Sequence, residues 1–177
     1  MYVLGIDGGG TKTTGVISDQ LGNILAQQTV GATNPNSTKQ ELIEAQFISL
    51  FRHMAEENEE AFLQVKAIFI GMAGVDRPDD QAKVKAMLTK IYQSFNSGEI
   101  VKVIVDNDAV NALCSGTLGS PGIVNIAGTG SITFGINSEG RRARVGGWGY
   151  LLGDPGSGFA IGRAALQHVF AVYDGYL

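Results

Sequence analysis

Three consecutive glycines between two short apolar runs constrain the fold of this chain more than any other feature. Gly8, Gly9 and Gly10 follow the apolar run 2–6 and precede the run 13–18, which is rich in Thr, Val and Ile. Short apolar runs bounded by glycine predict buried strands. Glycine also allows a sharp bend and a close approach of a ligand to bare backbone. The sequence therefore predicts two strands joined by a turn with accessible N–H groups.

The residues around this turn are suited to an anion. Bare N–H groups at a tight turn form a concave anion site, Thr11 and Thr13 add hydroxyl donors, and Lys12 adds positive charge. Asp7 lies where it could hold Mg²⁺ through water, since this ion keeps much of its hydration. A plain hairpin with a solvated lysine is the simpler alternative, but it does not need three glycines. We therefore predict a phosphate loop over 7–13; it is not a Walker loop, which opens a helix.

The remaining pattern predicts an α/β protein with a mixed sheet. A third strand over 24–30 completes an antiparallel meander, and the apolar runs 67–71 and 101–105 are typical of strands covered on both faces. Thr38 and Glu41 form a capping box that predicts a helix beginning there. Amphipathic helices should connect the later strands by right-handed crossovers, which makes those strands parallel.

A Gly/Ser/Pro stretch at 116–122 predicts a link between two domains, 1–116 and 117–177. In the second domain the pattern restarts with strands over 122–127, 131–136 and 142–146. A helix over 156–173 follows, with Ile161, Ala165, Val169 and Val172 along its expected inner stripe.

Two carboxylates follow the strand 101–105. The carboxyl ends of strands form the ligand edge of an α/β sheet, so either carboxylate could accept a proton from a hydroxyl that attacks a γ-phosphate. Asp108, which opens the next helix, is the better placed candidate. The alternative is that Asp108 caps this helix and Asp106 lies on the surface. The motif alone supports both interpretations equally.

Two further glycine segments lie in the second domain. Gly128, Thr129 and Gly130 form another strand–turn–strand, which could close on a polyphosphate or be a plain hairpin. Segment 146–158 places Trp148 among glycines and Asp154 in a Pro/Gly loop. An aromatic side chain and a carboxylate suit a sugar pocket. The alternative is that Trp148 packs in the core and Asp154 forms a turn.

Charge and cysteine content limit the partners. A net charge of −4 gives no reason to expect nucleic acid or an anionic membrane. No apolar run approaches the ~20 residues of a membrane span. The single cysteine excludes an internal disulfide and a four-cysteine zinc site, and it fits a reducing cytoplasm.

Taken together, the four glycine and aspartate motifs resemble the N-acetylglucosamine kinase and BadF/BadG/BcrA/BcrD-type ATPase branch of the actin/hexokinase/Hsp70 superfamily. The segment from Gly147 to Gly158 is the most specific part. The resemblance implies an actin-like ATPase (ribonuclease H-like) fold with an incomplete second lobe, ATP and Mg²⁺ as cofactors, and a homodimer. It implies that Asp7 holds the metal and Asp108 is the catalytic base. ATP would be bound by Gly8, Gly9, Gly10, Thr11, Lys12, Thr13, Gly128, Thr129 and Gly130, and the sugar by Asn34, Asp108, Ser131, Gly147, Trp148, Gly149 and Asp154.

The leading hypothesis is an ATP-dependent kinase of an amino sugar such as N-acetylglucosamine or glucosamine. An ATPase that couples hydrolysis to a partner protein is the alternative, and a sugar or nucleotide sensor without turnover is a third. Family members carry an adenosine-binding segment after the helix that follows Asp154. We therefore expect the 177-residue chain to bind ATP poorly and to have little kinase activity alone.

Overall fold

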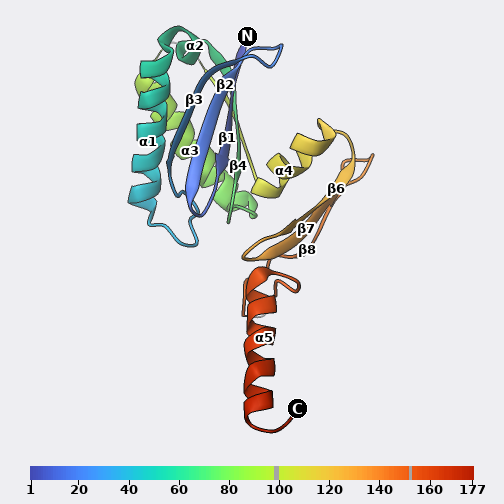
Figure 1. The fold of residues 1–177 in the computed structure, drawn as a ribbon. Coiled ribbons are helices and arrows are strands. Elements are labelled where there is room, and N and C mark those ends of the chain that lie inside the picture. Colours follow the sequence, from blue (N-terminus) through green and yellow to red (C-terminus); the bar gives the residue numbers. More distant parts are fainter. Residues whose placement is uncertain (98–99, 152) are drawn as a thin grey trace. The chain divides into compact units, whose positions relative to one another are not determined.

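The computed structural model describes residues 1–97, 100–151 and 153–177 (Figure 1). Leu152, within the fourth glycine-rich segment, lies outside the described residues. The chain forms two compact units, Met1–Asn111 and Ala112–Leu177, and the boundary between them falls inside helix α4 (Asp108–Thr117). The domain division at 116/117 stays a prediction. Each unit has a sheet of its own.

The first unit contains a five-stranded sheet in the order β3-β2-β1-β4-β5. Strands β1 (Tyr2–Gly8), β2 (Lys12–Ser18) and β3 (Ile24–Gly31) form an antiparallel meander. Strands β4 (Val65–Met72) and β5 (Lys102–Asp106) then add parallel to β1. The predicted mixed sheet is confirmed. Its parallel strands all end beside the glycine turn that follows β1.

Helices α1 (Gln40–Glu57) and α3 (Pro78–Phe95) pack side by side on this sheet, and the short helix α2 (Glu59–Leu63) follows α1 (Figure 1). The core between helices and sheet includes a cluster of aromatic rings with centroids 5.2–6.4 Å apart. Aromatic pairs at this spacing stabilise a core beyond the area they bury. The cluster consists of Phe51, Phe62, Tyr92 and Phe95.

The first helix begins later than its predicted capping box. Gln40 is its first residue and Lys39 its N-cap, without a side-chain hydrogen bond. The N–H of Thr38 instead donates to the carbonyl of Asn34 at 2.9 Å, because residues 34–38 form a turn. The capping prediction was therefore wrong: Thr38 belongs to the loop that leads into the helix.

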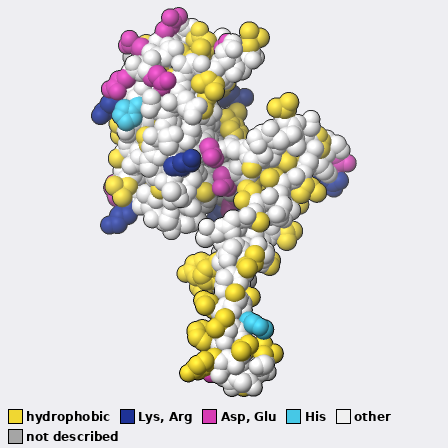
Figure 2. Space-filling model, in the orientation of Figure 1, with side chains coloured by type: hydrophobic (Ala, Val, Ile, Leu, Met, Phe, Trp, Pro, Cys, Tyr) yellow, Lys and Arg dark blue, Asp and Glu magenta, His cyan; other side chains and the backbone are white. Residues whose placement is uncertain are grey.

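The second unit contains an antiparallel sheet of β6 (Gly122–Ala127), β7 (Ser131–Ile136) and β8 (Arg142–Gly146), followed by helix α5 (Gly158–Tyr173). The expected inner stripe of α5 is exposed: Ile161 is 64%, Val169 57% and Val172 51% accessible. Figure 2 shows apolar side chains along this helix. That expectation was wrong, because no described element of the unit covers α5. Within the described ranges, no helix is long and apolar enough to cross a membrane.

Candidate functional site

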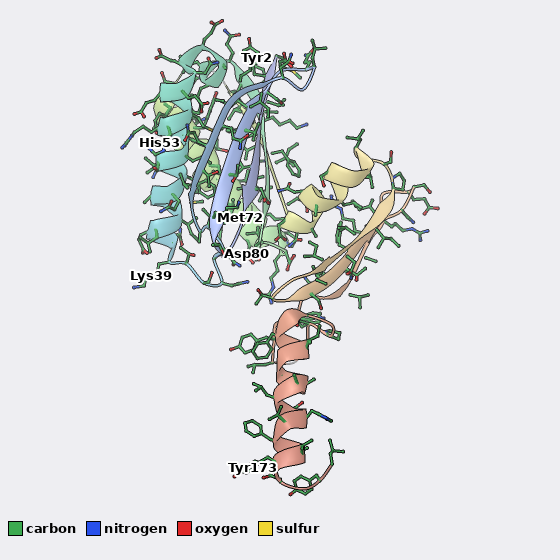
Figure 3. All side chains as sticks on the ribbon, viewed as in Figure 1. Tyr2, Lys39, His53, Met72, Asp80 and Tyr173 are labelled. Carbon is green, nitrogen blue, oxygen red and sulfur yellow. The ribbon has the colours of Figure 1, made fainter. Side chains whose placement is uncertain are left out.

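Three backbone hydrogen bonds hold the glycine turn of the first unit. The N–H of Gly9 donates to the carbonyl of Lys12 at 3.0 Å and closes the turn. The N–H of Thr33 donates to Gly9 at 3.0 Å, and that of Ala73 donates to Gly8 at 2.8 Å. Residues beyond β3 and β4 are thus bonded to the turn. Figure 3 labels Met72, the last residue of β4, at this end of the sheet.

Close packing explains two of the three glycines. A Cβ at Gly8 would lie 2.9 Å from Thr33 Oγ1, and one at Gly9 would lie 2.9 Å from the carbonyl oxygen of Lys12. A Cβ at Gly10 would meet only Asn34 Nδ2, at an ordinary 3.8 Å. Gly10 and Lys12 are exposed. Gly8 is buried and Gly9 is half-buried, while the tip of the turn is open to a ligand.

The two threonines of the turn differ in their surroundings. Thr11 is exposed. Thr13 is fully buried, and its hydroxyl is hydrogen bonded to that of Thr33 at 2.8 Å. Sequence analysis treated both as hydroxyl donors to a ligand. In the folded chain the Thr13 hydroxyl supports the turn from inside, and Thr11 is the one that reaches solvent.

Asn34 lies beside this turn because of a local side-chain hydrogen bond. Its Oδ1 accepts from the backbone N–H of Asn36 at 2.9 Å, which is the geometry of an Asx turn. Gly74, just after β4, has a left-handed φ of +80°, and a Cβ there would lie 2.5 Å from Asn34 Oδ1. The amide of Asn34 is therefore held between the backbone of Gly74 and the tip at Gly10.

Asn107, and not Asp108, caps helix α4. Asn107 Oδ1 accepts from the N–H of Ala109 at 2.9 Å, and its carbonyl accepts from Val110 at 3.1 Å. Asp106 is only 8% exposed and accepts from the N–H of Asn107 at 2.9 Å. The alternative in which Asp108 is a cap and Asp106 lies on the surface is therefore wrong. Asp108, the first residue of α4, is left without a capping role.

The surroundings of Asp108 favour its proton-bound form. Burial raises the pKa of this carboxyl above its ordinary 3.8. The backbone N–H of Ala109 lowers the pKa in part, and the negative charges of Asp7 and Asp76 raise it further. A carboxylate with a raised pKa is a stronger proton acceptor, which suits a general base. Asp76 is also fixed, because Asn107 Nδ2 donates to its Oδ1 at 2.6 Å.

The exposed carboxylate of Asp7 receives a hydrogen bond from helix α4. Asn111 Nδ2 donates to Asp7 Oδ1 at 3.0 Å. Among the described residues, no group of three or more His, Cys, Asp or Glu side chains could enclose a metal. Mg²⁺ commonly keeps several waters and binds through one or two carboxylates together with substrate phosphates. Asp7 fits that kind of hydrated site and does not fit an all-protein cage.

Sequence analysis missed Thr33, Asp76, Asn107 and Asn111. Each has a hydrogen-bond partner at least 20 residues away along the chain. Two signals were available: the glycines at 71 and 74, which mark close backbone packing after β4, and Asn107 itself, because asparagine is a preferred N-cap residue.

In the second unit, the turn between β6 and β7 is bonded to the start of α5. Gly158 N–H donates to the carbonyl of Gly128 at 2.7 Å, and the hydroxyl of Ser131 donates to the carbonyl of Pro155 at 2.8 Å. Ser157 caps α5 by accepting from Ala160 N–H at 3.1 Å. The predicted residues 128–131 thus share one small structure with the loop that carries Asp154.

Asp154 is the most unusual residue of this loop. It has a left-handed φ of +57° although it is not glycine, and it is only 6% exposed. Its Oδ1 has no hydrogen-bond partner in the described chain, and a Cβ at Gly130 would lie 2.8 Å from its Oδ2. Buried polar atoms are normally paired, and strained backbone gathers at functional sites. Asp154 therefore has the features of a ligand-binding carboxylate.

Trp148 is presented on the surface by its flanking glycines. Gly147 and Gly149 have left-handed φ values of +70° and +88°. Gly147 N–H donates to the carbonyl of Ser131 at 2.8 Å. The indole is 75% exposed and lies 4.9 Å from the guanidinium carbon of Arg144. In this structure Trp148 is not a core packing residue, so that alternative was wrong.

Comparisons with known proteins found a matching family and several similar proteins. The BadF/BadG/BcrA/BcrD ATPase family matches residues 4–177. The chain is 40% identical over 179 residues to the N-acetyl-D-glucosamine kinase of Dictyostelium discoideum, covering 97% of this chain and 54% of that protein. It is 39% identical over 173 residues to the N-acetylmuramic acid/N-acetylglucosamine kinase of Clostridium acetobutylicum, covering 98% and 55%. The chain thus spans about half the length of these relatives.

Solved structures show the same fold. A candidate N-acetylglucosamine kinase from Chromobacterium violaceum is 26% identical with a TM-score of 0.72, over 99% of this chain and 59% of that one. The ROK hexokinase of Thermus thermophilus is 20% identical with a TM-score of 0.65, over 96% and 64%. The second likeness is evidence for the fold alone. The predicted actin-like ATPase fold is confirmed.

Proposed function

Because the chain belongs to the BadF/BadG/BcrA/BcrD ATPase family, we propose that the whole protein is an ATP-dependent kinase of an amino sugar such as N-acetylglucosamine or glucosamine. The relatives at 40% and 39% identity are named as kinases of N-acetylated amino sugars, which supports this substrate class. Within the family, an ATPase without a sugar acceptor is the alternative.

The state of Asp108 is the observation that carries the proposal. A kinase needs a group that accepts the proton of the attacking hydroxyl, whereas helix capping needs only an oxygen acceptor. Asn107 performs the capping, so the Asp108 carboxylate is available for another role. Its pKa is raised by burial and then by Asp7 and Asp76, which strengthens it as a base.

The glycine turn would hold the phosphates of ATP. Gly10, Thr11 and Lys12 offer an N–H group, a hydroxyl and an ammonium at the exposed tip, while the three backbone hydrogen bonds keep the turn in one shape. A binding site that is fixed before its ligand arrives loses less entropy on binding. Bound Mg²⁺ supplies neutralisation of phosphate charge, and Asp7 would hold it through water.

The second unit would supply sugar contacts. The unpaired buried oxygen of Asp154 can accept a hydrogen bond from a ring hydroxyl, which would satisfy it. The exposed face of Trp148 can pack on a sugar ring. Ser131, Gly147 and Gly149 shape the same loop, and Gly128, Thr129 and Gly130 form the neighbouring turn, for which we propose a phosphate contact.

The proposal is tested by ADP release from the whole protein with a panel of amino sugars. We expect N-acetylated or free amino sugars to stimulate release, and Asp108→Asn to abolish transfer while ATP still binds. Asp79→Asn is the matched control, because Asp79 lies in the first turn of α3 as Asp108 does in α4. ADP release that no sugar stimulates would overturn the kinase proposal in favour of the ATPase alternative. The expected homodimer stays a prediction, which sedimentation of the whole protein checks.

A further inference from the structure

We propose that Asn111 is a positioning residue that fixes the orientation of the Asp7 carboxylate. It would do so by tying helix α4 to the ends of strands β1 and β4. The structural part of this inference concerns the chain itself. Its consequence for Mg²⁺ rests on the proposed kinase function.

The contacts of one amide group carry the argument. Asn111 Nδ2 donates to Asp7 Oδ1 at 3.0 Å, and it also reaches the carbonyl of Ile6 at 3.3 Å and that of Gly71 at 3.4 Å. The amide has two hydrogens, so the two longer contacts share its donor capacity with the shorter one. One side chain of α4 is therefore bonded to both parallel strands, β1 and β4. Of its three partners, two are backbone carbonyls and one is the side chain of Asp7.

The absence of a side chain at Gly71 makes room for this amide. A Cβ at Gly71 would lie 2.4 Å from Cγ, Nδ2 and Oδ1 of Asn111, which no real contact permits. Gly71 is not among the glycines with a left-handed φ, so its backbone does not require glycine. The close approach of Asn111 is what requires it. The two positions depend on each other although 40 residues separate them.

The chemistry of the contact suits a carboxylate that must bind a cation. A neutral amide orients Asp7 without cancelling its charge, which a lysine or arginine at the same place would do. Apart from this contact, the Asp7 side chain is exposed to solvent. The negative charges of Asp7 and Asp76 both raise the pKa of Asp108, so Asp7 lies among acidic groups that repel it. Side chains that hold a metal-binding carboxylate in place commonly change metal affinity or activity by ~10–100-fold when removed.

Rotamer measurements on the 177-residue chain test the structural part without any activity assay. Three-bond NMR couplings of Asp7 should report one χ1 rotamer in the wild type. They should report averaging in Asn111→Ala and in Asn111→Leu. The second variant keeps about the size of the side chain but has no hydrogen-bond donor and no charge, so it separates hydrogen bonding from packing.

Two more variants make this test specific. Gly71→Ala should displace Asn111 without changing it and should give the same averaging at Asp7. Asn96→Ala is the matched control: Asn96 Nδ2 donates to the carbonyl of Leu63 at 2.7 Å and to the Tyr92 hydroxyl at 3.4 Å, at the end of α3. It should leave the Asp7 couplings unchanged. Unchanged Asp7 couplings in the Asn111 variants would overturn the positioning role.

The whole protein then tests the functional part. We expect Asn111→Ala to raise the Mg²⁺ concentration for half-maximal phosphoryl transfer about tenfold, and Asn96→Ala to leave it unchanged. An unchanged Mg²⁺ requirement, in variants whose Asp7 couplings do change, would refute the link to the metal. A wild-type protein without sugar-dependent turnover would remove the proposed function but leave the positioning result standing.

Discussion

Replacing Asp154 with glycine should stabilise the chain while removing a proposed sugar contact. Asp154 has a left-handed φ of +57°, is 6% exposed, and leaves Oδ1 without a partner. Glycine adopts this backbone conformation without steric cost and has no carboxylate to bury. Residues that serve a ligand are often held at a cost to stability, and their removal then raises it.

The expected gain can be worked from these features. Relief of left-handed strain contributes ~1 kcal/mol, and removal of an unpaired buried oxygen contributes ~1–3 kcal/mol. Against this, glycine costs ~0.5–1 kcal/mol in unfolded-state entropy, and one buried methylene group costs ~0.8 kcal/mol. The difference is a gain of about 0.2–2.7 kcal/mol, so we expect Asp154→Gly to raise the free energy of unfolding by roughly 1.5 kcal/mol.

Urea titration followed by tryptophan fluorescence measures this change. Trp148 is the single tryptophan of the chain and lies in the same unit, so its signal reports the unit that contains Asp154. Asp154→Asn is the control, because asparagine also tolerates the left-handed region but lacks the charge. It should give a smaller gain. A loss of stability in Asp154→Gly would refute the strain and desolvation argument.

Three further changes test the first unit. Gly8→Ala places a Cβ 2.9 Å from Thr33 Oγ1 and should lower the free energy of unfolding by about 1–3 kcal/mol in urea titration. Burial raises the pKa of Asp108, so the folded chain binds more protons than the unfolded chain between pH 3.8 and the raised pKa, and stability falls as pH rises through that window. At a pH above that window, Asp108→Asn should therefore have a higher Tm than the wild type. Equal Tm values at neutral pH would contradict this. Phe62→Ala removes a fully buried ring, and calorimetry should show a loss of about 3–5 kcal/mol.

Most of the sheet could be predicted from the sequence because the relevant signals are local. The apolar runs 2–6 and 67–71 each fall within a strand, and the run 101–105 falls within β5 except for Val101. The short helix α2 was missed, since its few residues carry two glutamates and only one fully buried side chain, Phe62. Five residues are too few to show a helical period.

The sequence by itself determined the strands, the exposed glycine turn and the family to which they point. Only the tertiary structure decided which hydrogen-bond partner each polar side chain beside that turn takes. Asn107 Nδ2 donates to Asp76 Oδ1 across 31 residues, and Asn111 Nδ2 donates to Asp7 Oδ1 across 104 residues. The physical reason is that strand and turn patterns depend on consecutive residues. Hydrogen bonds between distant side chains depend instead on which strand ends lie side by side in the parallel sheet and on how a helix packs against them.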